Sequence, residues 1–279
     1  MHTIPNLSLH DGLTLPAIGF GTYSLKGEAG VAGIKSAIEL GYRLLDSAFR
    51  YENEGTVGEA VRQASVPRDE LVICSKLPGK RHAYQEALET VQESLYRGRL
   101  DYYDLYLIHW PNPRINLYVE AWQALIEAKK RGYVRSIGVC NFLPEHIERL
   151  VAETGVKPSL NQIELHPYFN QEELRKWHKE QQIVTESWSP LGRSTGMLEQ
   201  PEITGIARRY GKTPSQVVLR WHIQLGALPI PRARSAEHQQ ENLEVFDFEL
   251  TPEEMALING LTRADGRLQD QDPAVYEEF

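Results

Sequence analysis

Eight short apolar runs recur along this chain, and segments with the residue spacing of amphipathic helices lie between them. This alternation is typical of βαβ units, in which helices cover a parallel sheet. The chain has 279 residues and no linker or low-complexity tract, so one eight-stranded barrel fits better than two separate domains. The predicted strands are AIGFG (17–21), YRLLD (42–46), ELVICSK (70–76), YDLYLIH (103–109), VRSIGVCN (134–141), SLNQIEL (159–165), IVTESW (183–188) and ALPIP (227–231).

The predicted fold is an α/β (β/α)8 TIM barrel that spans residues 1–279 as a single domain, with an N-terminal β-hairpin and a short C-terminal tail. Asp11-Gly12 is a turn sequence that suits the hairpin. Capping-box patterns that begin at Thr213 and Thr251 predict the starts of two helices, because each Thr hydroxyl can accept a hydrogen bond from a free N–H of the first turn.

Charge and cysteine content exclude several classes of function. The net charge of −8 argues against a nucleic-acid partner, although PRARS at 231–235 forms one basic cluster. Cys74 and Cys140 stand alone, so neither a disulfide framework nor a metal site is predicted. No apolar run approaches the roughly 18 residues of a membrane span, and the N-terminus lacks a targeting pattern. We expect a cytoplasmic protein without membrane or nucleic-acid partners, and a monomer because no exposed apolar helix is evident.

Polar residues interrupt the apolar strands mainly at their carboxyl ends. In a barrel of this type those ends share one face, and that face carries the active site. Residues that are distant in the sequence would therefore meet there. They are Asp46, Lys76, His109, Asn141, Gln162, Glu164, Trp188 and, just after the eighth strand, Arg232.

One kind of reaction is suggested by four residues taken together, namely Asp46, Tyr51, Lys76 and His109. A lysine that ends the apolar run LVIC is expected to pair with a carboxylate, and Asp46 is the natural partner. The ammonium would lower the pKa of Tyr51 from the usual phenol value of about 10 and make it a general acid. His109 would orient a substrate carbonyl. Such a site suits carbonyl reduction, although Asp46 taken singly could be a helix cap, Tyr51 a packing side chain and Lys76 a surface charge.

Carbonyl reduction needs a hydride source, and the chain lacks the usual dinucleotide fingerprint. GFGTYS at 19–24 contains Gly-x-Gly but carries Ser24 where the third glycine is required. A dinucleotide would therefore have to bind in another way.

In its motifs the chain resembles the aldo-keto reductases over essentially its whole length. The matching segments, in that family's order, are GFGTY, LDSAFRYENE, KLP, DLYLIHWP, RSIGVCNF, NQIELHPY, ESWSPLG and IPRARSAEHQQEN. The resemblance implies the barrel fold, NADPH-dependent carbonyl reduction and a catalytic tetrad of Asp46, Tyr51, Lys76 and His109. It also implies that NADPH lies extended across the barrel mouth.

Cofactor contacts are implied by the same resemblance. The nicotinamide would stack on Trp188, and its carboxamide would be held by Asn141 and Gln162. The contacts implied for the pyrophosphate, the 2′-phosphate and the adenine are Ser189, Leu191, Gly192, Arg232, Arg234, Ser235, His238, Glu241 and Asn242.

Three positions depart from the family pattern. Cys140 and Ala233 stand where serine is usual, and His238 replaces a common arginine that helps to bind the 2′-phosphate. Arg234 would compensate, because the local charge remains positive. We therefore expect NADPH as the cofactor and NADH as a weaker one.

The WPNP stretch, the short segment LGRSTGMLEQPE and the tail GRLQDQDP resemble the smaller bacterial 2,5-diketo-D-gluconate reductases. Short loops imply an open, polar pocket for an aldehyde, a ketone or a keto-sugar acid. Its implied lining is Tyr23, Phe49, Arg50 and Trp110, with Arg50 holding a substrate carboxylate. Simple packing is an equal alternative for Tyr23 and Phe49, and a solvent-facing position is an equal alternative for Arg50.

Three other functions remain open from the sequence. A general aldehyde or methylglyoxal reductase would use the same site. A barrel glycosidase would use Glu164 and Glu186 as paired carboxylates, but it leaves Tyr51, Lys76 and His109 without a role. A cofactor-binding subunit without turnover is disfavoured by the intact tetrad.

Overall fold

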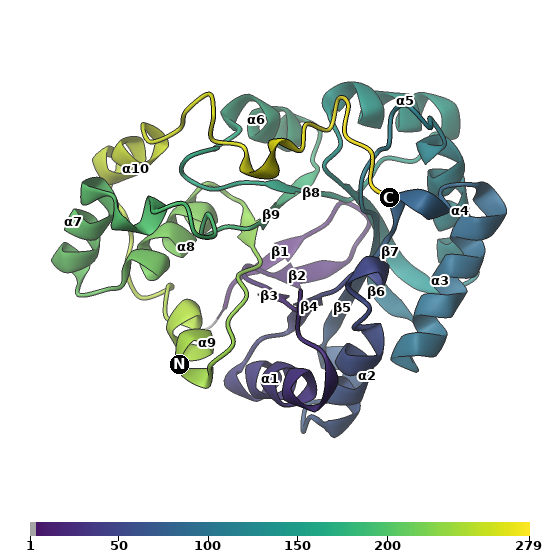
Figure 1. Cartoon of the computed structure of the whole chain (residues 1–279), viewed down its shortest axis with the longest axis horizontal. Coiled ribbons are helices and arrows are strands. Elements are labelled where there is room, and N and C mark those ends of the chain that lie inside the picture. Colours follow the sequence, from purple (N-terminus) through teal and green to yellow (C-terminus); the bar gives the residue numbers. More distant parts are fainter. Residues whose placement is uncertain (1–3) are drawn as a thin grey trace.

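Eight parallel strands form a barrel at the centre of the protein, as the computed structural model, which describes residues 4–279, shows in Figure 1. The first three residues of the predicted domain lie outside the described part. The strands pair side by side in the order β10-β9-β8-β7-β6-β5-β4-β3. Their bounds are β3 (Phe20–Gly21), β4 (Leu44–Asp46), β5 (Val72–Leu77), β6 (Tyr103–Ile108), β7 (Val134–Cys140), β8 (Leu160–Glu164), β9 (Val184–Trp188) and β10 (Leu228–Pro229).

Two backbone hydrogen bonds join the outer edges of this sheet. The N–H of Gly19 donates to the carbonyl of Pro229 at 3.0 Å, and the N–H of Gly21 donates to the carbonyl of Pro231 at 3.0 Å. The predicted barrel is therefore confirmed. Its last strand is shorter than the predicted run 227–231 because a proline has no N–H and cannot complete a ladder.

Helices surround the barrel (Figure 1). Their bounds are α1 (Gly27–Leu40), α2 (Glu54–Gln63), α3 (Tyr84–Gly98), α4 (Tyr118–Lys130), α5 (Pro144–Thr154), α6 (Glu172–Glu180), α7 (Pro201–Tyr210), α8 (Pro214–Gln224), α9 (Ala236–Leu243) and α10 (Pro252–Asn259). The predicted capping boxes are confirmed, since the hydroxyls of Thr213 and Thr251 accept from the N–H groups of Gln216 and Glu254.

The predicted N-terminal hairpin closes one end of the barrel. Its strands are β1 (Asn6–Ser8) and β2 (Thr14–Pro16), which pair antiparallel. Leu15 packs with the inward-facing strand residues Leu44 and Leu105. The carboxylate of Asp11 accepts from the hydroxyl of Ser136, near the start of β7, at 2.8 Å. The hairpin therefore covers the amino ends of the strands, and a site can open only at their carboxyl ends.

A C-terminal tail, residues 264–279, runs over the carboxyl ends of the strands (Figure 1) and finishes beside the segments that follow β5 and β6. The N–H of Leu268 donates to the carboxylate of Glu164, at the end of β8, at 2.6 Å. The tail thus crosses the face that carries the predicted site. Within residues 4–279, no helix combines the length and apolarity needed to cross a membrane.

Candidate active site

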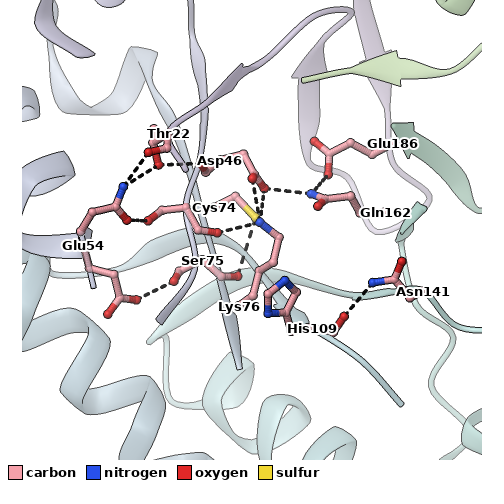
Figure 2. A network of polar contacts seen from close by, with 12 residues as sticks. Thr22, Asp46, Glu54, Cys74, Ser75, Lys76, His109, Asn141, Gln162 and Glu186 are labelled. Carbon is pink, nitrogen blue, oxygen red and sulfur yellow. Dashed lines mark hydrogen bonds and ion pairs between the residues drawn. The ribbon is translucent and has the colours of Figure 1, made fainter. Parts of the chain in front are cut away.

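A buried ion pair lies at the centre of the carboxyl face (Figure 2). The ammonium of Lys76, at the end of β5, donates to both carboxylate oxygens of Asp46, at the end of β4, at 2.6 and 2.7 Å. It also donates to the carbonyl of Ser47 at 2.7 Å. The side chain of Lys76 is fully buried, so all three ammonium protons meet oxygens and the charge is compensated. The predicted pairing is confirmed.

Thr22 and Asn53 support the strand end that carries Asp46. The Thr22 hydroxyl donates to the Asp46 carbonyl at 2.8 Å. The Asn53 amide donates to the Thr22 carbonyl at 2.8 Å and accepts from the Ser47 hydroxyl at 2.8 Å. These buried bonds fix the position of the carboxylate, and through it the position of Lys76.

Tyr51 is the last residue of a short 3₁₀ turn, Phe49–Tyr51, and is half-buried against the ion pair. The Lys76 ammonium lies 5.1 Å from the centre of its ring, and the His109 ring lies 5.9 Å away in an edge-to-face arrangement. Burial raises the pKa of Tyr51 well above the usual phenol value, although the charge of Lys76 opposes this rise. The Lys76 ammonium lowers the pKa of Tyr51 as expected, but burial outweighs it, so the net shift of the pKa is upward and not downward.

Gln162 connects the ion pair to a second buried carboxylate. Its amide donates to Asp46 at 2.8 Å and to Glu186 at 2.7 Å, as Figure 2 shows. Burial and the charge of Asp46 raise the pKa of Glu186 to about 8. Glu186 is therefore a neutral acid at pH 7. Within residues 4–279, no hydrogen bond engages the side-chain oxygen Oε1 of Gln162, so this oxygen can accept from a ligand amide.

Asn141 and Trp188 lie beside this group. The Asn141 amide donates to the His109 carbonyl at 3.0 Å and accepts from the Trp188 indole at 2.7 Å. Asn141 has a φ of +61°, a conformation that asparagine tolerates better than most residues. The structure thus brings together the three residues predicted to hold a nicotinamide.

Three arginines lie close to one another, and one of them, Arg193, lies beside the Trp188 ring. Arg193 donates to the Ser189 hydroxyl at 2.9 Å and lies 5.8 Å from the Trp188 ring. Partial burial and the positive charges of Arg234 and Arg193 lower the pKa of Arg232. Mutually repelling cations favour a bound anion, so this donor set fits the phosphates of a dinucleotide. Sequence reasoning missed Arg193, whose signal was a lone positive charge in the segment LGRS.

The other predicted cofactor residues fall into a loop and a helix. Leu191 and Gly192 follow β9, and Gly192 has a φ of +66°. The hydroxyl of Ser235 caps α9 by accepting from the N–H of His238 at 3.3 Å. The α9 residues predicted to contact adenine are Glu241, which accepts from the Thr213 hydroxyl, and Asn242, which is buried.

Two of the predicted substrate residues lie near Tyr51 and His109, whereas a third points elsewhere. Tyr23 is 58% exposed and packs edge-to-face on Tyr51 at 5.0 Å. Trp110 is buried against Tyr276 of the tail, with ring centres 4.4 Å apart. The ring of Phe49 faces the Arg97 guanidinium of α3 at 3.8 Å, which is a packing contact.

Arg50, the fourth predicted substrate residue, meets a carboxylate of the protein itself. Its guanidinium lies 3.5 Å from Glu278, and Glu278 also lies 2.8 Å from Nδ1 of His109. Sequence reasoning missed Glu278, because nothing in an aperiodic tail indicates which strand end it reaches.

Glu164 does not present the carboxylate that a glycosidase would require. It is buried, contacts His166 at 3.0 Å and accepts from the tail. Glu186 is fully buried inside the barrel. Neither residue can flank a sugar, which removes the basis for that alternative. No group of three potential metal ligands occurs in residues 4–279.

Comparison with known proteins gives concordant results. The Aldo/keto reductase family model matches residues 17–263. The chain is 50% identical to 2,5-diketo-D-gluconic acid reductase B from a Corynebacterium species, over 100% of both chains. It is 44% identical to methylglyoxal reductase DkgA from Escherichia coli, over 96% of both chains.

Solved structures agree with the observed fold. A crystal structure of a Gox0644 mutant in complex with NADPH superposes with a TM-score of 0.94 and 41% identity, over 99% of this chain and 100% of that one. A Bombyx mori aldo-keto reductase in complex with NADP superposes with a TM-score of 0.90 and 34% identity, over 100% of this chain and 99% of that one.

Proposed function

This chain belongs to the aldo/keto reductase family, and from that premise we propose that it reduces carbonyl groups with NADPH, using Tyr51 as the proton donor. The observation that carries the proposal is the buried Asp46–Lys76 pair, which lies against Tyr51 and His109 at the carboxyl face. A phenol, an ammonium and an imidazole beside one another suit a carbonyl oxygen that gains negative charge.

In this mechanism the nicotinamide cofactor supplies the hydride that adds to the carbonyl carbon. The raised pKa of Tyr51 keeps the phenol protonated at neutral pH. As the carbonyl oxygen becomes an alkoxide, which is a stronger base than a phenolate, the Tyr51 O–H bond breaks and the proton moves to that oxygen. Lys76 then stabilises the phenolate, and Asp46 holds Lys76 in place.

NADPH is the cofactor that the donor set supports. Arg193, Arg232 and Arg234 would hold its phosphates, and the side-chain oxygen of Gln162 would accept from its carboxamide. The similar structure in complex with NADPH supports this assignment. His238 in place of arginine leaves NADH as a weaker cofactor.

A keto-sugar acid such as 2,5-diketo-D-gluconate is the proposed substrate, because the relative at 50% identity is a 2,5-diketo-D-gluconic acid reductase. Methylglyoxal is the second candidate, since DkgA is named for it. We further propose that the protein acts as a monomer on this small molecule, and in a reducing compartment such as the cytoplasm, because Cys74 and Cys140 are free and buried.

The test is the oxidation of NADPH and NADH by the wild type and by Tyr51→Phe, with 2,5-diketo-D-gluconate, methylglyoxal, glyceraldehyde and an aromatic aldehyde as substrates. Loss of the general acid should lower kcat by about 10²–10⁴-fold, while the Kd for NADPH, followed by fluorescence quenching, stays the same. Full activity of the variant would refute the role of Tyr51. If methylglyoxal gives the highest kcat/KM, the protein is a general dicarbonyl reductase.

A further inference from the structure

We propose that Glu278, the penultimate residue, is a positioning residue of the active site that selects the protonated form of His109. The proposal rests on the proposed function, in which His109 binds the substrate oxygen. Glu278 lies 169 residues after His109 in the sequence, yet its carboxylate reaches within 2.8 Å of Nδ1.

Hydrogen bonds from Asn112 and Gly79 hold Glu278 in place. The amide of Asn112 donates to the Glu278 carbonyl at 3.1 Å and accepts from the Glu278 N–H at 3.1 Å. The N–H of Gly79 donates to the second carboxylate oxygen at 2.8 Å. A Cβ at Gly79 would lie 2.4 Å from the Asn112 amide and 2.6 Å from the Glu278 carbonyl, so glycine leaves the space that the tail needs. The Glu278 side chain is 3% exposed.

The groups around Glu278 keep its carboxylate charged. Burial alone would raise its pKa, but His109, the N–H of Gly79 and Arg50 lower the pKa to about 2. His82 is also nearby and is buried, and its pKa is lowered to about 4 by that burial, so it is neutral at pH 7. The N–H of Gly79 and the guanidinium of Arg50 favour the charged carboxylate independently of the His109 ring.

A carboxylate at Nδ1 restricts the protonation of the imidazole. The contact is electrostatic, since the carboxylate approaches away from the N–H axis, but a lone pair on Nδ1 would still be repelled. Nδ1 must therefore carry a proton. In a neutral ring that leaves Nε2 as an acceptor, which cannot bind a carbonyl oxygen.

Only the doubly protonated ring can face Glu278 and donate from Nε2 to a substrate. The Glu278 carboxylate, 2.8 Å from Nδ1, is the counter-ion that such a ring requires in a buried site. Tyr51 faces the same ring and adds no charge while it remains a phenol. The tail thus supplies a charged donor for the oxygen that Tyr51 protonates.

The experiment compares Glu278→Gln with Glu277→Gln and Glu278→Asp. Glu277 is a matched control, because it lies in the same tail but accepts from the N–H of Arg114, at 2.6 Å. Glu278→Gln should move the basic limb of the kcat pH profile to lower pH, and it should lower kcat more than it changes KM. Glu278→Asp should restore part of the profile, and Glu277→Gln should match the wild type.

A readout independent of turnover is the ¹⁵N chemical shift of the His109 ring, assigned with His109→Asn. At a pH where the ring of Glu278→Gln is neutral, the wild-type ring should still be doubly protonated. An unchanged ring shift or an unchanged pH profile in Glu278→Gln would overturn the proposal. A wild type without reductase activity would instead refute the proposed function and leave the ring measurement to decide the role of Glu278.

Discussion

Replacing Asp46 by leucine should destabilise the protein severely, because it leaves the buried Lys76 ammonium without its carboxylate partner. Lys76 is 0% exposed and has three oxygen partners, of which Asp46 supplies two. After the substitution only the Ser47 carbonyl would remain. Removing one partner of a buried ion pair typically costs about 3–5 kcal/mol.

Urea denaturation of the wild type, Asp46→Leu and the double variant Asp46→Leu/Lys76→Met measures this cost. The double variant removes both charges, so it should recover about 2 kcal/mol or more of the loss in the single variant. The slope of unfolding free energy against urea concentration should be the same in all three proteins. A shift of the denaturation midpoint then reports a change in stability.

A surface ion pair provides the control. Lys26 and Glu52 lie 2.9 Å apart, but their side chains are 51% and 76% exposed. Glu52→Gln should leave the denaturation midpoint almost unchanged, because solvent screens such pairs. The reasoning fails if Asp46→Leu loses less than about 1 kcal/mol, the range of exposed pairs, or if the double variant is no more stable than the single one.

Two further substitutions address other parts of the site. The folded state keeps a proton on Glu186 up to a pH of about 8, whereas an unfolded carboxyl loses it near 4.5, so wild-type stability should fall as the pH rises between these values. Glu186→Gln should remove this decline, and unfolding free energies at pH 5 and 8 that change equally in both proteins would contradict the assignment. Arg193→Ala should lower the kcat/KM ratio of NADPH to NADH by about tenfold, the value of one charged hydrogen bond. Equal losses with the two cofactors would show that Arg193 does not select for the additional phosphate.

The fold and the ion pair could be predicted because both depend on local patterns. Alternating apolar runs specify parallel strands, and the carboxyl ends of such strands meet on one face whatever the loops do. Asp46 and Lys76 end their strands, so their encounter required no knowledge of loop conformation.

Residues carried by loops and by the tail could not be placed in the same way. Glu278 reaches His109 because Gly79 and Asn112 form hydrogen bonds with it. No periodic pattern in the sequence relates the tail to the segments that carry these two residues. The direction of the pKa shift of Tyr51 was missed for a different reason. That shift is the net result of two opposing effects, because burial raises the pKa and the charge of Lys76 lowers it. The extent of burial is known only from the complete fold.

The seam of the barrel, where Gly19 and Gly21 bond to Pro229 and Pro231, also bears on aggregation during folding. Pro229 and Pro231 accept from Gly19 and Gly21, but neither proline has an N–H to offer in return. Ile230, which lies between them, directs its N–H to Ser187 on the opposite side. If the seam opens, the exposed edge of β10 therefore presents acceptors without donors, and a strand from another molecule cannot form a complete ladder on it. The residues that complete the barrel would thus also protect its partly folded chain from intermolecular strand pairing.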